Sequence, residues 1–214
     1  MRPKTIAREF GHHFPFTVFS TALGLIVVVF LTVVLEARDA EGISEYFRQL
    51  FHLFHPLHVL MSAIATTAMF WRFNRKPIKA AVGGAVGSLG ICGLSDIFIP
   101  WLGGRLIGAP MHLHVCIIEH SLVVIPFTLL GILTGFIAAD RFLDRTSTIF
   151  SHSSHVLIST MASLLYFISF GFVLRAENGF VVFVFVVLAV IVPCCTSDIL
   201  FPLVAARRGG PTRG

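Results

Sequence analysis

Residues 14–35 read FPFTVFSTALGLIVVVFLTVVL, a stretch without one charged side chain. A helix needs about 20 apolar residues to cross the hydrocarbon core of a bilayer. Five more apolar runs follow this one along the chain. We therefore predict an all-α membrane protein with six transmembrane helices, at about 14–35, 55–71, 80–102, 111–139, 153–173 and 179–206.

The composition of the whole chain supports this class. Of its 214 residues, 56% are hydrophobic and only 13% are charged, whereas a soluble domain carries about 25% charged residues. These values exclude a secreted disulfide scaffold and a disordered chain. The net charge of +5 is explained by membrane topology, so we expect no nucleic-acid partner and take the lipid bilayer as the main partner.

The basic residues indicate how the six helices are oriented. Twelve of the 16 Lys and Arg residues lie in the N-terminus, the second and fourth loops and the C-terminal tail. Cytoplasmic loops are enriched in Lys and Arg, so both termini are predicted to be cytoplasmic, in an inner or plasma membrane of bacterial type. The first run is longer than the core of a signal peptide, and we expect it to remain as a helix.

The two halves of the chain resemble each other. Residues 55–62 (HPLHVLMS) match 152–159 (HSSHVLIS), and 92–100 (CGLSDIFIP) match 194–202 (CCTSDILFP), with a weaker match of 13–24 to 120–131. We predict two three-helix repeats, residues 1–106 and 107–214. Because three is odd, the second repeat would cross the membrane in the opposite sense, giving the 3+3 inverted-topology plan of several transporter folds.

This topology predicts two polar clusters of the same composition. The cluster near the outer face contains His55, His58, Cys92, Asp96, Glu119 and His120. The cluster near the inner face contains His12, His13, His152, His155, Cys194 and Asp198. The histidine pairs are spaced i,i+3 and the Cys–Asp pairs i,i+4, so each pair shares a helix face.

Ionisable groups at membrane depth are costly and point to function. Imidazole, carboxylate and thiolate bind divalent transition metals. We therefore predict that both clusters bind such an ion, Zn²⁺ above all, with Fe, Mn, Co and Ni as alternatives.

Several other residues receive structural interpretations. His52, His112 and His114 lack repeat mates and are expected to bond backbone carbonyls or to meet lipid headgroups, although they would also suit a weak collecting site. Cys116 and Cys195 are expected to pack. Pro100 either ends its helix or, in a helix that continues, leaves the carbonyl of Asp96 free. Gly24 and Gly131 are expected where the first and fourth helices cross.

The sequence supports two functions of different classes. The first is a transporter of divalent transition-metal ions that works by alternating access, and the chain contains no hydrolase or nucleotide-binding motif. The alternative is a membrane metalloenzyme or redox protein with a His-ligated metal or haem centre, which needs one merged site instead of two. A carrier of protons or of a small organic solute is a third reading, and a homodimer is compatible with all three.

Overall fold

The computed structural model describes residues 3–37, 42–73, 75–139, 145–175 and 177–208, and the side chains at 11, 14–37, 42–72, 75–139, 153–175 and 177–193. The described chain is helical and contains no strand. Its elements are α1 (Pro3–Glu36), α2 (Ile43–Phe73), α3 (Pro77–Gly93), the π-helical turn η1 (Leu94–Phe98), α4 (Ile99–Leu106), α5 (Cys116–Glu119), α6 (Ser121–Ala138), α7 (Arg145–Ser169) and α8 (Gly179–Arg208).

Four stretches of the described chain are long and apolar enough to cross a membrane: Phe14–Glu36, Ile43–Arg72, Pro77–Leu106 and Ser121–Ala138. Two shorter apolar helices, Ser153–Ser169 and Gly179–Pro193, accompany them. Large apolar side chains cover the outside of the bundle, such as Leu122, which is 90% exposed. An apolar exterior of this kind suits contact with lipid.

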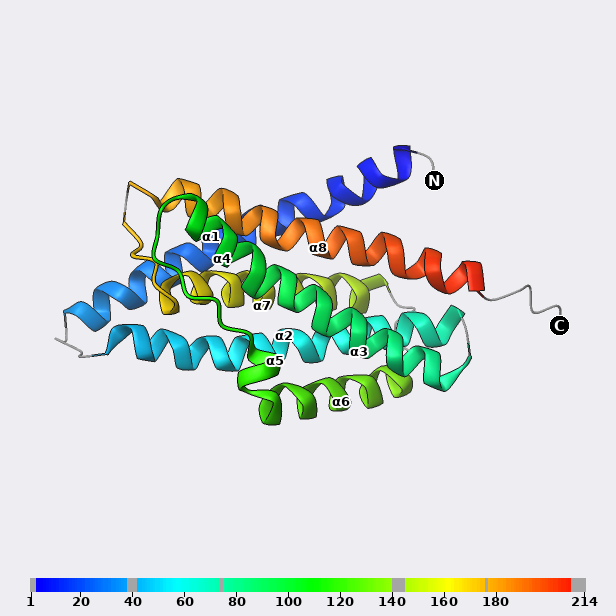
Figure 1. The fold of residues 1–214 in the computed structure, drawn as a ribbon. Helices are drawn as coiled ribbons and strands as arrows, with labels where there is room; N and C mark the ends of the chain where they lie inside the picture. The colour runs from blue at the N-terminus through cyan, green and yellow to red at the C-terminus, as the bar shows by residue number, and fades with distance from the viewer. Residues whose placement is uncertain (1–2, 38–41, 74, 140–144, 176, 209–214) are drawn as a thin grey trace.

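The helices form two layers of three (Figure 1). In one layer α2 packs between α3 and α6, and in the other α1 packs against α7 and α8. The two layers meet where α2 packs along α7 and where η1 and α4 pack against α7 and α8. The long helices alternate in direction, and α1 begins at the end of the bundle where α8 ends (Figure 1). The α2–α7 contact therefore lies at the centre of the molecule.

Helix α2 starts at Ile43, twelve residues before the predicted start at residue 55. Polar residues such as Glu45 and Arg48 lower the hydropathy of this segment and hide it from a search for apolar runs. Its inner face is nevertheless apolar, because Phe47 and Phe51 are fully buried. The ring of Phe51 packs against Tyr166 and Phe170 of the α7 end.

The predicted single helix at 111–139 is wrong at its start. Residues 109–115 are not helical, the short helix α5 follows, and α6 begins only at Ser121. Figure 1 shows this segment returning from one end of the bundle towards its middle before α6 begins. Non-helical backbone at membrane depth is tolerated where protein groups satisfy it, and here the amide of His112 donates to the carbonyl of Phe170 at 3.0 Å.

The helix at the Asp96 motif continues past Pro100 to Leu106, so the proline does not end it. Pro100 has no amide hydrogen for the carbonyl of Asp96 four residues earlier. The chain passes this point through the turn η1, in which the amide of Ile99 donates to the carbonyl of Leu94. Single π-helical turns of this kind are frequent at functional sites, and this one carries the buried Asp96.

The two matched glycines do not mark a crossing of α1 with α6. Gly131 faces α2, and a methyl group there would lie 2.6 Å from the carbonyl oxygen of Leu60 and 2.7 Å from the Cβ of Ala63. Gly24 instead faces Leu164 of α7. Each glycine thus allows close approach to the central helix of the other predicted repeat, because the absence of a side chain brings the backbones together.

We expect Gly131→Ala to destabilise the protein by about 1–3 kcal/mol, because α2 has to shift to accept the added methyl group. The measurement is thermal unfolding of the purified protein in detergent. Gly90→Ala is the matched control, since a Cβ there meets nothing within 4 Å. An equal loss of stability in both variants would contradict the close packing of α6 on α2.

Candidate metal site

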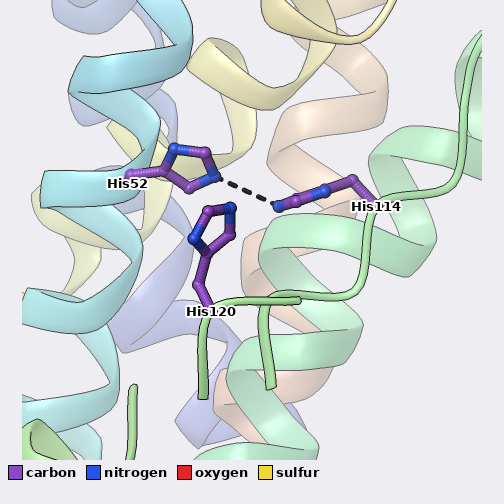
Figure 2. Close-up of side chains that lie close together, drawn as sticks. All are labelled: His52, His114 and His120. Atoms are coloured by element: carbon purple, nitrogen blue, oxygen red, sulfur yellow. Dashed lines mark hydrogen bonds between the residues drawn. The ribbon is translucent and has the colours of Figure 1, made fainter. Parts of the chain in front are cut away.

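Three histidines from distant parts of the chain meet beside α2. We call His52, His114 and His120 the metal group. They lie on α2, on the non-helical segment before α5, and at the start of α6. One ligand nitrogen of each lies within 4.8 Å of the other two, and among the described side chains no other group of three or more such residues does so. Figure 2 shows the three rings gathered around a common space.

The distances in the metal group suit a transition-metal ion. The Nε2 atoms of His52 and His114 are 3.1 Å apart, and the ring centres of His52 and His120 are 4.2 Å apart. Two nitrogens bound to one tetrahedral Zn²⁺ at about 2.0–2.1 Å lie about 3.3 Å from each other. Three imidazoles leave a fourth position open, as in zinc sites that exchange a ligand.

Glu119 orients one of the three rings. Its Oε2 lies 2.7 Å from Nδ1 of His114, which places the ring hydrogen on Nδ1 and leaves the lone pair of Nε2 facing His52. Burial lowers the pKa of His114, although Glu119 opposes this shift. The backbone amide of Val115 and the ring of His114 lower the pKa of Glu119. At neutral pH the group therefore offers a neutral imidazole beside a charged carboxylate.

Tyr166 of α7 holds the segment that carries His114. Its hydroxyl accepts a hydrogen bond from the amide of His114 at 3.0 Å and donates one to the carbonyl of His112, also at 3.0 Å. These bonds satisfy backbone groups that have no helical partner. The metal group is thus positioned by α7 as well as by its own elements.

A second polar cluster lies deeper in the bundle. We call Asp96, His55, His58, His155, Ser95 and Ser159 the Asp96 network. The Asp96 carboxylate is fully buried and accepts hydrogen bonds from Nδ1 of His55 at 2.9 Å and Nδ1 of His58 at 2.8 Å. The hydroxyl groups of Ser95 and Ser159 donate to it at 2.7 Å and 3.3 Å. Four donors therefore surround one carboxylate.

His155 corrects the prediction of two clusters on opposite faces. Its Nε2 lies 2.8 Å from Nε2 of His58, so a residue expected near the inner face touches one expected near the outer face. The packing of α2 along α7 brings the two together at the centre of the bundle. His58 and His155 therefore belong to one cluster inside the bundle and not to two clusters at opposite faces.

The other predicted ligands divide into three sets. Glu119 and His120 lie at the metal group, although Glu119 ends the short helix α5 and His120 precedes α6, so neither stands two turns within a helix. Cys92 is buried in the apolar core. The side chains of His12, His13, His152, Cys194 and Asp198 lie outside the described residues. Metal binding by the Asp96 network or by these residues stays a prediction.

Sequence reasoning set His52 and His114 aside, and the structure places both in the metal group. For His114 the requirement for a repeat mate was misleading, because among the described residues the non-helical segment before α5 has no counterpart at the start of α1. The usable signal was the spacing of His52, His55 and His58, which puts three histidines along one face of a helix. For Cys116, burial raises the pKa of the thiol to about 12, which agrees with a packing role.

We expect Glu119→Gln to weaken zinc binding by about 10–100-fold, the usual cost of removing the partner of a ligating histidine. Competition between the purified protein and a zinc chelator measures this affinity. Glu177→Gln is the control, because Glu177 is an exposed acid that pairs with Arg175. Unchanged affinity in Glu119→Gln would show that Glu119 does not orient a ligand.

Comparison of the chain with known family models, with curated proteins and with solved structures finds no match.

Proposed function

We propose that this protein transports divalent transition-metal ions across a membrane, and that the metal group is where the ion binds first. One observation carries the proposal: three imidazoles converge beside α2, a helix long and apolar enough to span a bilayer. Neutral imidazole suits Zn²⁺, Fe²⁺, Co²⁺ and Ni²⁺ better than Mg²⁺ or Ca²⁺, which prefer oxygen ligands. Zn²⁺ is the ion we expect first, and Mn²⁺ is a weaker alternative.

The position of the metal group beside α2 favours transport over static storage. His52, His55 and His58 follow one another at intervals of three along α2, and the last two bond to Asp96. The ring of Phe51 contacts both His52 and His55. A line of polar groups thus leads from the metal group into the centre of the bundle, where transporters commonly bind their substrates.

We further propose that α7 and α8 also cross the membrane, which gives six spans arranged as a 3+3 inverted repeat. The packing supports this plan, because the largest contacts of each repeat have counterparts when α1, α2 and α3 are exchanged for α6, α7 and α8. The contact of α2 with α6 corresponds to that of α7 with α1, and α2 with α3 to α7 with α8. The contact of α2 with α7 corresponds to itself under this exchange, and it is where the matched residues His58 and His155 meet.

The charge distribution supports cytoplasmic termini. Arg72, Arg75, Lys76 and Lys79 lie at the end of the bundle where α1 begins and α8 ends. The metal group then belongs to the outer half of the membrane. We also propose that the protein lies in a plasma or inner membrane and that it forms a homodimer.

Reconstituted protein tests this function. Full-length protein in liposomes that contain a zinc-sensitive dye should admit Zn²⁺ faster than empty liposomes and should not admit Mg²⁺. The double variant His52→Ala/His114→Ala should reduce influx to the level of empty liposomes. Absence of zinc movement through the wild type, under either direction of gradient, would overturn the proposal.

A membrane metalloenzyme is the second candidate, favoured by the open fourth position of the metal group and by the contact of His58 with His155. An enzyme needs one site, and the described clusters adjoin each other. The absorption spectrum of the purified protein separates the two candidates. A Soret band or an iron charge-transfer band favours the redox reading, whereas a colourless protein that moves zinc favours transport.

A further inference from the structure

The connection between α2 and α3 concentrates positive charge at one end of the bundle. We call residues 71–79 the basic turn. Its four basic side chains are all exposed, and they are Arg72, Arg75, Lys76 and Lys79. From residue 46 to residue 118 the sequence has a single acid, Asp96, which is buried inside the bundle. Helices α2 and α3 therefore bring no acid of their own to this end.

The cations at the opposite end of the bundle are arranged differently (Figure 1). Arg48 pairs with Glu45 in the first turns of α2, and Arg175 pairs with Glu177 just before α8 begins. In the described part of the chain, neither Arg72 nor the two lysines of the basic turn form an ion pair with an acidic side chain. Their charge is available to an anion from outside the chain.

Two further features of the basic turn suit a lipid phosphate. Trp71 packs edge-on against Phe136 of α6, and the guanidinium group of Arg75 lies 5.3 Å from the centre of the Trp71 ring. Tryptophan is enriched where the hydrocarbon of a bilayer meets water. Helix α3 begins at Pro77 with no side chain capping its first amides, and free amides at the start of a helix favour negative charge.

The basic turn is placed to meet the headgroups of a bilayer. It joins Ile43–Arg72 to Pro77–Leu106, two stretches that are long and apolar enough to cross a membrane, so it reaches a headgroup layer in either orientation of the protein. Ile78 is 78% exposed between the two lysines, and it adds an apolar contact beside the charges. Clusters of four or more basic residues next to a membrane-spanning helix are typical of sites that bind anionic lipids.

We propose that the basic turn binds the headgroup of an anionic phospholipid, whose upper acyl chain packs against Trp71. The occupant is a lipid of the surrounding membrane and not a soluble phosphate, because Trp71 and Ile78 offer an apolar surface that only a lipid fills. The three cations without an acidic partner attract the phosphate. This inference depends on the membrane location of the protein but not on metal transport.

The fluorescence of Trp71 tests the inference in full-length protein reconstituted into vesicles. Trp101→Phe leaves Trp71 as the only tryptophan. The vesicles are phosphatidylcholine with a small fraction of either phosphatidylglycerol or phosphatidylcholine that is brominated near the headgroup, because bromine quenches a nearby indole. Brominated phosphatidylglycerol should be enriched beside Trp71 at least about fivefold over its bulk fraction, since the attraction of even one basic side chain to an anionic surface gives about this factor.

The triple variant Arg72→Gln/Lys76→Gln/Lys79→Gln, made in the same background, should lower the enrichment to the bulk value. Its quenching by brominated phosphatidylcholine should stay unchanged, which shows that Trp71 keeps its place. Arg48→Gln is the matched control, because it removes a cation that is already paired at the other end of α2. It should keep the full enrichment.

Equal quenching by the two brominated lipids in the parent protein would overturn the inference. Enrichment that survives in the triple variant would also overturn it, because the lipid would then be held elsewhere. Enrichment that is abolished by excess glycerol phosphate, at matched ionic strength, would make the basic turn a site for soluble phosphates instead. Zinc flux in the same vesicles tests the proposed function separately, so the loss of either result leaves the other standing.

Discussion

His120→Ala is expected to weaken zinc binding to the purified protein by more than about 100-fold. Removal of a residue that only supports a ligand already costs about 10–100-fold, and His120 supplies one of three nitrogens that lie within 4.8 Å of each other. Two imidazoles alone hold Zn²⁺ too weakly to compete with a chelator. Titration against a zinc chelator at neutral pH measures the loss.

The control for His120→Ala is His112→Ala, which removes an exposed ring from the same segment. Its affinity should match that of the wild type. His52→Ala and His114→Ala should each lose as much affinity as His120→Ala, because all three contribute one ligand. If the three variants kept wild-type affinity, the zinc would be held elsewhere and the metal group would be a packing contact.

Asp96→Ala is expected to have the largest effect on stability, about 3–5 kcal/mol, and to abolish zinc transport. The change removes the acceptor of two imidazole N–H groups and two hydroxyl groups inside the bundle. Breaking one partner of a buried charged cluster costs this much because the others remain unpaired. Thermal unfolding in detergent and zinc flux in liposomes measure the two effects.

Asp96→Asn separates the charge of Asp96 from its shape. The amide keeps one oxygen acceptor but turns an NH₂ group towards donors, so we expect a smaller loss of stability and the same loss of transport. Ser88→Ala is the matched control on α3, because Ser88 bonds only to the carbonyl of Ala85 in its own helix. Wild-type zinc flux in Asp96→Asn would remove Asp96 from the transport mechanism. By the repeat, Asp198→Ala is expected to behave as Asp96→Ala does.

The parts of the fold that depend on local sequence were predictable. The apolar runs identified all-helical structure, and the spacing of His55 and His58 identified one polar face of α2. That Asp96 meets both histidines also followed from the topology, because α2 and the helix of Asp96 are neighbours in the chain. The predicted start of α2 was wrong, since the first turns of this helix are amphipathic and bury Phe47 and Phe51, the latter against α7.

The parts that depend on packing between distant segments were not predictable. The contact of His58 with His155 depends on how α2 lies along α7, which no local pattern encodes. The break before α6 depends on Tyr166, whose hydroxyl replaces the helical partners of the segment around His114. Hydropathy alone predicts one helix over residues 111–139, because the non-helical residues 111–115 are mostly apolar, like the helix that follows them.

Helix α7 contacts both polar clusters, and it is one continuous helix between the two contacts. Tyr166 bonds to the backbone of His112 and His114, in the segment that carries one member of the metal group. His155, which precedes Tyr166 by eleven residues or about 16 Å along the helix axis, contacts His58. A shift of α7 along its axis therefore moves the contacts of Tyr166 and His155 together. The two polar clusters are therefore mechanically linked, because a displacement of the His114 segment is transmitted through α7 to the contact between His155 and His58.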